Sequence, residues 1–380
     1  MSALHRFSYG PKVVAGRGAV AELPALLPPG RVLFVTDAGV RAAGLTDTPL
    51  ATLVQSGREP IVFDAVEPDP SLATLLAAVA AGQGAASVVG FGGGSPMDVA
   101  KLAAYLVGSQ GDIDAVWGVG NATGTGLPLV LVPTTAGTGS EATPVAVITL
   151  PDGEKRGVNS AALVAGHALL DPELTLGLPR HVTAATGIDA MVHAIEATTS
   201  KHAKNPLSDM LAREALRLLA ANLLTACDRP SDIDAREAML LGSHLAGVAF
   251  ANAPVAGVHA LAYPLGGHFH LPHGLTNALM LGPVLMHNMG AALHDYAALG
   301  PLVDPALEPL GNHARARGLI ETMARLSAAT GLPQRLREVG VARGDLPMLA
   351  AEAMKHQRLL VNNPRPITQA DALRLYEAAF

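Results

Sequence analysis

Residues Ser87–Leu106 are SVVGFGGGSPMDVAKLAAYL, and this passage is the strongest indication of the protein's architecture. It begins as an apolar run, passes through Gly92, Gly93 and Gly94, and continues as a helical pattern opened by Pro96. A strand that leads through glycines straight into a helix is typical of parallel α/β sheets. Such a turn aims backbone N–H groups and the helix dipole at one point, where a phosphate can bind. A plain tight loop gives the same pattern, so the glycines alone do not show that this turn binds a phosphate.

The alternation of strand and helix extends through the first half of the chain. Four short apolar runs predict strands, namely Arg31–Thr36, Pro60–Phe63, Ser87–Phe91 and Leu129–Val132. Alanine-rich helical patterns separate them, which predicts a parallel sheet with crossover helices.

The pattern of apolar and polar residues changes near Pro179, where long helical patterns begin. One of them, PLSDMLAREALRLLAANLL, has Ser208 or Asp209 as its expected N-cap. A chain of 380 residues is long enough for two domains. We therefore predict an α/β domain over residues 1–178 and an all-helical domain over residues 179–380.

The composition favours a globular protein that acts on a small molecule. It is 49% hydrophobic and 15% charged, with a net charge of -6 and no dense run of Lys or Arg, so neither nucleic acid nor a membrane surface is an expected partner. Cys227 is the only cysteine, which excludes an internal disulfide and a cysteine metal cluster. The start MSALHRFSYGPKVV lacks the apolar core of a signal peptide, and we expect a cytoplasmic location.

A second candidate ligand loop, VPTTAGTGSEAT, follows the strand that ends at Val132. It offers the hydroxyl groups of Thr134, Thr135 and Thr138 beside two glycines, which suits ribose or phosphate contacts as well as a polar turn. Both loops leave the carboxyl ends of strands, where ligands bind in open α/β sheets. Asp37, after the first strand, is compatible with a bond to an adenosine ribose, favouring NAD over NADP, and equally with a helix cap.

The second half contains a candidate metal site. In GIDAMVHAIEA, Asp189 and His193 are four residues apart on a helical pattern, so both project from one face. Four histidines follow in GVHALAYPLGGHFHLPHGLTNALML, namely His259, His268, His270 and His273. Histidines on apolar elements need partners, and either a metal or backbone carbonyls can supply them. One Asp and three His would suit Fe(II) or Zn(II) and leave a position for substrate.

These motifs together resemble the iron-containing, metal-dependent alcohol dehydrogenase family. The similarity is carried by GGGSPMDVAK, PTTAGTGSEAT, GIDAMVHAIEA, HALAYPLGGHFHLPHG and NNPRPIT, which are spread over most of the chain. The resemblance implies a dehydroquinate synthase-like fold, with a Rossmann-like dinucleotide-binding domain followed by an all-α metal-binding domain. It also implies NAD(H) as cofactor and one divalent metal, Fe(II) or alternatively Zn(II).

The resemblance assigns residues to both cofactors. It implies metal ligands at Asp189, His193, His259 and His273. It implies that the following residues face the nucleotide: Asp37, Gly93, Gly94, Ser95, Asp98, Thr134, Thr135, Thr138 and Lys155. Lys155 stands in the hairpin-like segment GEKRGV, where a lysine is often simply exposed.

The chain departs from the family at one position. Many members carry a second histidine four residues after the first in this segment, and here that residue is Tyr263. A tyrosine can relay a proton, but its ordinary pKa of about 10 makes it a poorer exchanger at neutral pH. Tyr263 is the candidate relay, and His268 and His270 are alternatives.

We therefore expect an NAD-dependent alcohol dehydrogenase that acts on a small primary alcohol or diol and its aldehyde, as a homodimer or larger oligomer. An oxo-acid reductase resembling maleylacetate reductases is the alternative on the same fold. An inactive nucleotide-binding protein is a more remote one. A complete set of one Asp and three His favours the first reading, and no cationic clamp for an acid is evident near these motifs.

Overall fold

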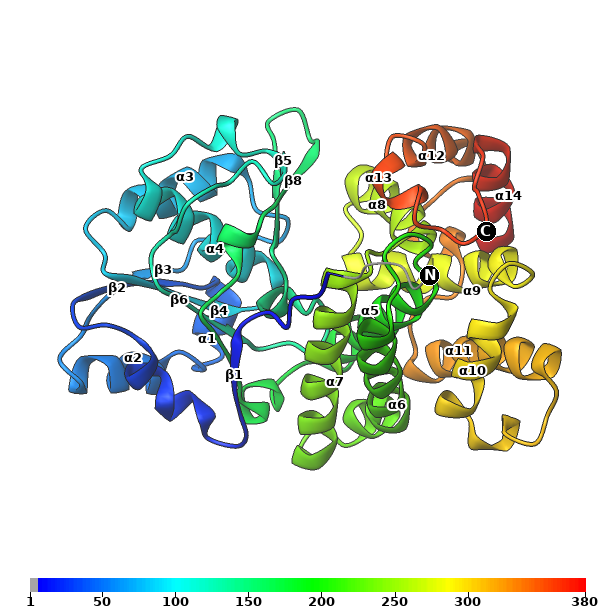
Figure 1. Cartoon of the computed structure of the whole chain (residues 1–380), viewed down its shortest axis with the longest axis horizontal. Coiled ribbons are helices and arrows are strands. Elements are labelled where there is room, and N and C mark those ends of the chain that lie inside the picture. Colours follow the sequence, from blue (N-terminus) through cyan, green and yellow to red (C-terminus); the bar gives the residue numbers. More distant parts are fainter. Residues whose placement is uncertain (1–5) are drawn as a thin grey trace. The chain divides into compact units, whose positions relative to one another are not determined.

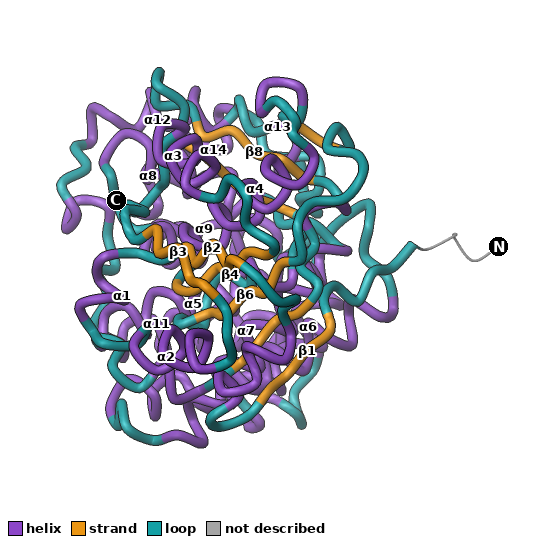
Figure 2. The backbone as a smooth tube through the Cα atoms, turned by 90° about the vertical axis from the view of Figure 1, so that its left-hand side faces the viewer, coloured by secondary structure: helices purple, strands orange, loops and turns teal. Residues whose placement is uncertain are grey.

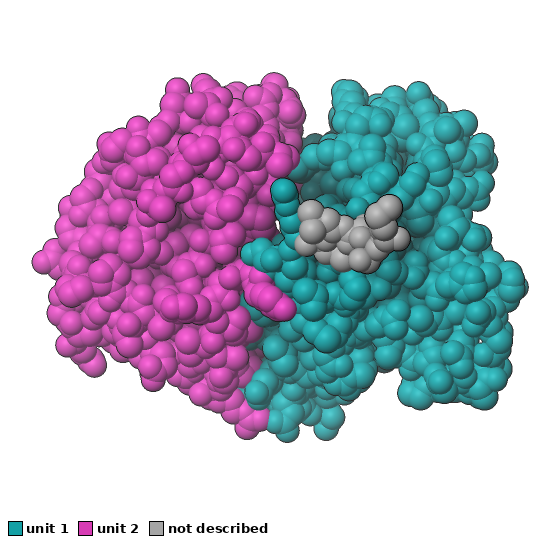
Figure 3. Space-filling model, in the orientation of Figure 1, with its two compact units in different colours: residues 1–8, 178–380 teal, residues 9–177 magenta. Residues whose placement is uncertain are grey.

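The computed structural model describes residues 6–380, which form two compact units. The unit that comes first in the chain is Tyr9–Gly177, coloured magenta in Figure 3, and the second is Leu178–Phe380 together with Arg6–Ser8, coloured teal. Ser8 belongs to the second unit through its backbone N–H, which donates to Asn252 Oδ1 at 2.7 Å.

The first unit is built on a six-stranded parallel sheet. Its strands are β1 (Lys12–Ala15), β2 (Arg31–Val35), β3 (Glu59–Phe63), β4 (Ser87–Gly92), β6 (Leu129–Pro133) and β9 (His167–Leu170). They are ordered β1-β9-β6-β4-β2-β3, and every pair is parallel. In Figure 2 the labelled strands β3, β2, β4 and β6 follow one another in this order. The four predicted strands are confirmed. Strands β1 and β9 were not predicted, because four-residue strands carry too little periodicity to stand out.

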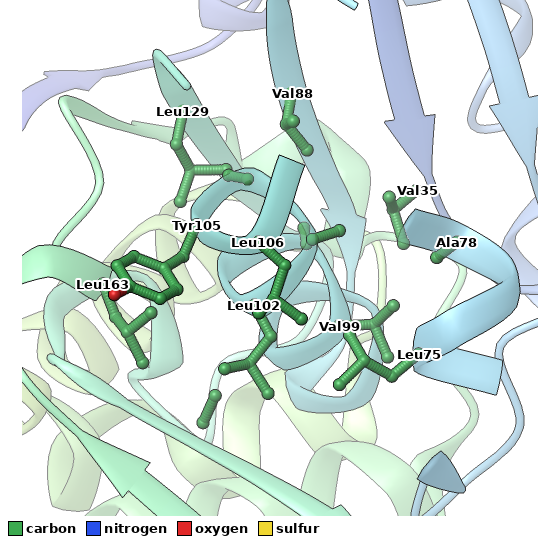
Figure 4. Packing of buried hydrophobic residues seen from close by; sticks show 14 of the residues in the cluster. Val35, Leu75, Ala78, Val88, Val99, Leu102, Tyr105, Leu106, Leu129 and Leu163 are labelled. Atoms are coloured by element: carbon green, nitrogen blue, oxygen red, sulfur yellow. The ribbon is translucent and has the colours of Figure 1, made fainter. Parts of the chain in front are cut away.

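Both faces of this sheet are covered. The helices of the unit are α1 (Ala38–Ala42), α2 (Asp47–Gln55), α3 (Leu72–Ala81) and α4 (Gly94–Ser109). Side chains alternate along each strand, so Leu33 and Val35 join α3 and α4 in one core, whereas Val32 and Phe34 join α2 in another. Figure 4 shows the first of these cores, where residues of α3 and α4 pack beside the sheet. A sheet buried on both sides explains why its strands are almost uniformly apolar.

A smaller sheet accompanies the first. It contains β5 (Gly118–Val119), β7 (Val145–Thr149) and β8 (Lys155–Asn159), in the order β5-β8-β7. Strands β7 and β8 form an antiparallel hairpin, with Thr149 opposite Lys155 at its closed end.

The described part of the second unit is helical throughout. Its helices are α5 (Arg180–Thr199), α6 (Pro206–Asp228), α7 (Ile233–Asn252), α8 (Gly257–Phe269), α9 (His273–Asn288), α10 (Leu293–Val303), α11 (Asn312–Thr330), α12 (Leu346–Ala353), α13 (Gln357–Leu360) and α14 (Gln369–Ala379) (Figure 1). Helix α5 packs against α6, α7 and α9 and is buried along almost its whole length. The predicted fold class, an α/β domain followed by an all-α domain, is confirmed.

The predicted cap of α6 is wrong. The helix begins at Pro206, and Asn205 is its N-cap, with Oδ1 accepting from the backbone N–H of Leu207 and Ser208. Ser208 lies inside the first turn, and its Oγ accepts from the backbone N–H of Asn205, which completes a capping box. Asn205 precedes a proline, and Pro at the first helical position is a start signal that outranks the Ser and Asp farther along.

Among the described residues, no single helix is both long and apolar enough to cross a membrane. The pair α7 and α8 reaches that length and composition only together, across a bend of 105°.

Candidate metal centre and nucleotide-binding loops

Helix α5 carries three ionisable side chains in a buried position. Asp189, His193 and Glu196 are only 2%, 4% and 3% exposed. Steps of four and three residues place all three along one face of the helix. Because buried charges and imidazoles need polar partners, this row marks a site rather than a packing surface.

Two further histidines reach this row from neighbouring helices. His259 is the third residue of α8, and His273 is the first residue of α9. The Nε2 atoms of His193, His259 and His273 lie 3.9, 3.8 and 3.8 Å from Asp189 Oδ1. Ligand atoms bound at about 2.0–2.2 Å to one ion are roughly 3–4 Å apart. The structure therefore places the three predicted histidines around Asp189, and the ligand atoms of Asp189, His193 and His259 all lie within 4.8 Å of one another.

The donor set and its surroundings fit a divalent transition metal. One carboxylate oxygen and three imidazole nitrogens suit Fe(II) and Zn(II). The side chains of Asp189, His193 and His259 are at most 6% exposed, whereas His273 is 36% exposed. The imidazole of His193 stacks between neighbours, with its centroid 4.8 Å from that of His259 and 4.4 Å from that of Phe250. The site is thus closely packed around His193 and accessible to solvent at His273.

The electrostatics of the centre favour an ionised carboxylate. Burial by itself would raise the pKa of Asp189, but the surrounding His193, His273 and His259 outweigh burial and lower it. Burial likewise opposes protonation of His259, and the adjacent Glu196 carboxylate overcomes it and raises the pKa of this imidazole. An anion held ionised in a dry place is an attractive position for a cation.

The sequence analysis missed two residues of this centre. Glu196 Oε2 lies 2.7 Å from His259 Nδ1, and Asn277 Nδ2 lies 2.5 Å from Asp189 Oδ1. The signal for Glu196 was its position three residues after His193 on the same helical pattern. Asn277 stands four residues after His273, so the same helical spacing could have found it.

The three candidate proton relays, Tyr263, His268 and His270, have different surroundings in the structure. The ring of Tyr263 is 5.7 Å from that of His273 and 6.5 Å from that of His259. His268 instead approaches Glu352 of α12 at 4.0 Å, and His270 follows the end of α8 with a positive φ of 52°. The ring that packs edge-on against Tyr263, at 5.1 Å, belongs to His356, which the sequence analysis did not consider.

The glycine-rich turn lies where the direction in which successive strands are added to the sheet reverses. Strands β2 and β4 are neighbours, and the chain proceeds from β2 to β3 on one side and from β4 to β6 on the other. Ligands of open α/β sheets bind beside the carboxyl ends of such strands. Gly93 is the N-cap of α4 and supplies no side-chain cap, which leaves the first N–H groups of this helix for a ligand.

Neighbouring loops close in on these glycines. A Cβ atom added to Gly94 would lie 3.0 Å from Thr138, and one added to Gly93 would lie 3.7 Å from Thr135. Thr134 is buried, and its backbone N–H donates to Gly92 O at 2.9 Å. The structure therefore brings the two predicted loops into contact, with Ser95 in the first turn of α4.

Asp37 is also found at this edge. Its Oδ1 accepts from the backbone N–H of Val40 at 2.8 Å and so caps α1. A Cβ atom on Gly92, which has a φ of 148°, would lie 3.3 Å from Asp37 Oδ2. Asp37 Oδ1 therefore serves as the helix cap, while Oδ2 faces the glycine turn.

Asp98 and Lys155 have partners inside the unit. Asp98 Oδ1 accepts from Ser140 Oγ at 2.6 Å, and Oδ2 accepts from the backbone N–H of Val147 at 2.9 Å. Lys155, at the closed end of the β7–β8 hairpin, has its Nζ 2.6 Å from Asp69 Oδ1. Both side chains are thus occupied by contacts that hold loops together.

A buried lysine completes the Asp98 network. Lys101 Nζ donates to Ser140 Oγ at 2.7 Å, to Thr143 Oγ1 at 3.2 Å and to Val145 O at 2.7 Å. It lies 3.6 Å from Asp98 Oδ1 and is 1% exposed. All three donors of the ammonium group are satisfied, so this cluster holds α4 against the end of the second loop and the start of β7.

Comparison with known proteins agrees with this arrangement. Residues 10–172 match the family model for iron-containing alcohol dehydrogenase, and residues 183–380 match the model for the C-terminal region of that family. The chain is 40% identical to long-chain-alcohol dehydrogenase 1 of Geobacillus thermodenitrificans, covering 99% of this chain and 96% of the relative. It is 37% identical to 1,3-propanediol dehydrogenase of Citrobacter freundii, covering 98% and 96%.

Solved structures are similar over the same length. A 1,3-propanediol oxidoreductase superposes with a TM-score of 0.95 at 35% identity, covering 99% of this chain and 100% of that one. An alcohol dehydrogenase from Oenococcus oeni gives 0.95 at 31% identity, with the same coverage. The predicted resemblance and the predicted enzyme class are confirmed, because both halves of the chain match one family of oxidoreductases. This protein belongs to the iron-containing alcohol dehydrogenase family.

Proposed function

We propose that this enzyme is a metal-dependent, NAD(H)-linked dehydrogenase that interconverts a small primary alcohol or diol with its aldehyde. The observation that supports this most directly is the cluster of three imidazole Nε2 atoms within 3.9 Å of the Asp189 carboxylate. The names of the relatives, a long-chain-alcohol dehydrogenase and a 1,3-propanediol dehydrogenase, support an alcohol or diol as substrate.

In this proposal Asp189, His193, His259 and His273 hold the divalent ion. When bound, such an ion polarises the oxygen of the alcohol or aldehyde, and NAD(H) exchanges hydride with the adjacent carbon. The three most buried ligands exclude water from one side of the site. His273, whose side chain is 36% exposed, leaves the opposite side accessible to substrate.

The loops of the first unit bind the nucleotide in this proposal. The N-terminus of α4, at Gly93, Gly94 and Ser95, receives the pyrophosphate through backbone N–H groups and the helix dipole. Thr135 and Thr138 line the same turn and offer hydroxyl groups to phosphate or ribose. The free oxygen of Asp37 accepts from a ribose hydroxyl and repels a 2′-phosphate, which favours NAD(H) over NADP(H).

Asp98, Thr134 and Lys155 have a supporting place in this proposal. Asp98 bonds to Ser140, Lys155 pairs with Asp69 at the surface, and Thr134 is buried. We propose that they shape the two loops around the nucleotide. Tyr263 stays the predicted proton relay, since its ring lies beside His273 and His259.

The ion is Fe(II) in this proposal, with Zn(II) as the alternative, because the donor set suits both and the family is iron-containing. A homodimer or larger oligomer and a cytoplasmic location remain predictions from the sequence.

The proposal is tested with purified enzyme that has been stripped by a chelator and reloaded separately with Fe(II) and Zn(II). NADH formation is measured with a panel of short primary alcohols and diols, and NADH consumption with their aldehydes and with oxo acids. We expect activity with alcohols and aldehydes only after reloading, and with NAD(H) in preference to NADP(H). Full activity of the stripped enzyme, or reduction of an oxo acid alone, would contradict the proposal.

A further inference from the structure

We propose that Glu196 is a positioning residue of the metal centre, which sets the orientation of the His259 ring and the start of the helix that carries it. This inference rests on the metal-binding role proposed above. It concerns how one helix, α5, controls a ligand that belongs to another helix, α8.

The carboxylate of Glu196 makes three hydrogen bonds to the beginning of α8. Oε2 accepts from the backbone N–H of Ala256 at 2.9 Å and lies 2.7 Å from His259 Nδ1. Oε1 accepts from the backbone N–H of Val258 at 2.7 Å. All of these groups are buried, and Glu196 and His259 are 3% and 2% exposed.

Glu196 acts as an N-cap supplied from another helix. The N-cap position of α8 is Ala256, which has no polar side chain and forms no side-chain cap of its own. The first N–H groups of a helix lack partners within it, and leaving them unpaired in a buried place costs free energy. Glu196 satisfies Ala256 and Val258, while Asn363 Oδ1 accepts from Gly257 at 3.3 Å. The residue immediately after this capped segment is His259.

The same carboxylate determines which nitrogen of His259 is available as a ligand. A neutral imidazole has one donor and one acceptor nitrogen, and an ionised carboxylate only accepts. Nδ1 must therefore donate to Glu196, which leaves the lone pair of Nε2 directed to the side where Asp189 Oδ1 lies 3.8 Å away. Outer carboxylates that hold a histidine in this way strengthen its binding to a metal.

The charges support the assignment. No Lys or Arg of residues 6–380 forms an ion pair with Glu196, although a buried carboxylate ordinarily needs a cationic partner. A divalent ion beside Asp189, with Glu196 behind His259, makes the buried cluster neutral overall. The placement of Glu196 is thus explained by a dication at the ligands and by the helix start that it caps.

The sharpest test is Glu196→Gln, which keeps size and shape. The new amide cannot accept at both oxygen positions, because its NH₂ group faces N–H donors. If the NH₂ group takes the place of Oε2, His259 Nδ1 must accept, which moves the ring proton to Nε2 and removes the ligand lone pair. If it takes the place of Oε1, the backbone N–H of Val258 loses its acceptor and the start of α8 is no longer held in place. We expect the Zn(II) affinity of the stripped full-length enzyme, measured by competition with a chromophoric chelator, to fall about 10- to 100-fold. The absorption spectrum of the Co(II)-loaded variant should also change.

Asp171→Asn is the matched control for burial of a carboxylate. Asp171 is 0% exposed and accepts from the backbone N–H groups of Gly18, Val20 and Glu173, and no histidine of residues 6–380 forms a hydrogen bond or ion pair with it. This variant should lower the melting temperature of the metal-free protein and leave its Zn(II) affinity within twofold of wild type. If Glu196→Gln also keeps its affinity within twofold, Glu196 only stabilises the fold and the inference is overturned.

Two further outcomes have separate consequences, namely a Glu196→Gln variant that does not fold and a wild-type enzyme that binds no metal. If Glu196→Gln does not fold, Glu196→Asp takes its place, because its carboxylate is one methylene too short to reach His259 Nδ1. We expect a weaker Zn(II) affinity, and an unchanged one overturns the inference. If the wild-type enzyme itself binds neither Zn(II), Co(II) nor Fe(II), the proposed metal-dependent function fails first.

Discussion

The side-chain nitrogen of Asn277 lies 2.5 Å from Asp189 Oδ1 and 3.2 Å from the Nε2 atoms of both His259 and His273. Asn277 is completely buried, and it reaches the ligand cluster from the second turn of α9. The amide thus holds the Asp189 carboxylate from a helix other than its own. A hydrogen bond to a charged group contributes about 1.5–3 kcal/mol, which is large enough to influence metal binding.

We therefore predict that Asn277→Leu weakens binding of Zn(II) about tenfold or more, since Asp189 loses the donor that orients it. Chelator competition on the stripped enzyme measures the change. Asn222→Leu is the control, because Asn222 also donates from a helix, to Leu218 O at 2.8 Å, but far along the chain from the ligands. Equal affinities of the two variants would show that Asn277 does not position Asp189.

Metal binding should stabilise the helical unit, because the four ligands come from α5, α8 and α9. A ligand that binds only the folded state, at about 100 times its dissociation constant, adds about 2.7 kcal/mol. We predict that the melting temperature of the stripped enzyme rises on addition of Zn(II), and that His273→Ala loses both this rise and the dehydrogenase activity. His313→Ala, at an exposed position in α11, should behave as wild type. A His273→Ala variant with the full thermal shift would exclude His273 as a ligand.

The buried ion pair of Lys101 and Asp98 should dominate the stability of the first unit. Lys101→Met leaves the Asp98 carboxylate and the Val145 carbonyl without their cationic partner, and breaking a buried pair costs about 3–5 kcal/mol. The fluorescence of Trp117, the only tryptophan, follows urea unfolding of this unit, because its ring packs against the α/β core. Lys12→Met, at an exposed position on β1, should change the free energy of unfolding by less than about 0.5 kcal/mol. A similarly small change in Lys101→Met would refute the prediction.

His356 should make the stability of the protein depend on pH. Burial, together with Arg358 and Lys355, lowers its pKa below the ordinary value of 6.5, against the opposing effect of Glu352. The unfolded chain then binds a proton at a higher pH than the folded chain, so stability falls as the pH drops through 6.5 towards the folded pKa. We predict that His356→Gln reduces the loss of stability between about pH 7.5 and about pH 5.5 in urea titrations.

The control for this pH effect is His313→Gln, whose residue is exposed. It should keep the wild-type difference between the two pH values. If His356→Gln keeps it as well, the imidazole of His356 does not hold a lowered pKa in the folded protein.

Much of this protein was determined by its sequence alone, because the relevant signals are local. The apolar run of β4, its three glycines and the helix that follows are contiguous, so a strand, a turn and a helix start could be predicted together. Asp189 and His193 share one helix, and a helical period of 3.6 residues places them side by side before any tertiary contact exists. Even here, Pro206 and Asn205 fixed the start of α6 more strongly than the Ser and Asp that the analysis preferred.

Only the tertiary structure decided which histidines join this pair and which residues hold them. His259, His268, His270 and His273 have the same chemistry in the sequence, but only the first and last of the four lie against Asp189. Glu196 and Asn277 gain their roles from atoms 63 and 88 positions away in the chain. Asp98 likewise accepts hydrogen bonds from Ser140 and Val147, which lie more than 40 positions away in the chain. Such contacts depend on how whole helices and strands pack, and the periodicity of a single segment carries no information about the partner that packing brings to it.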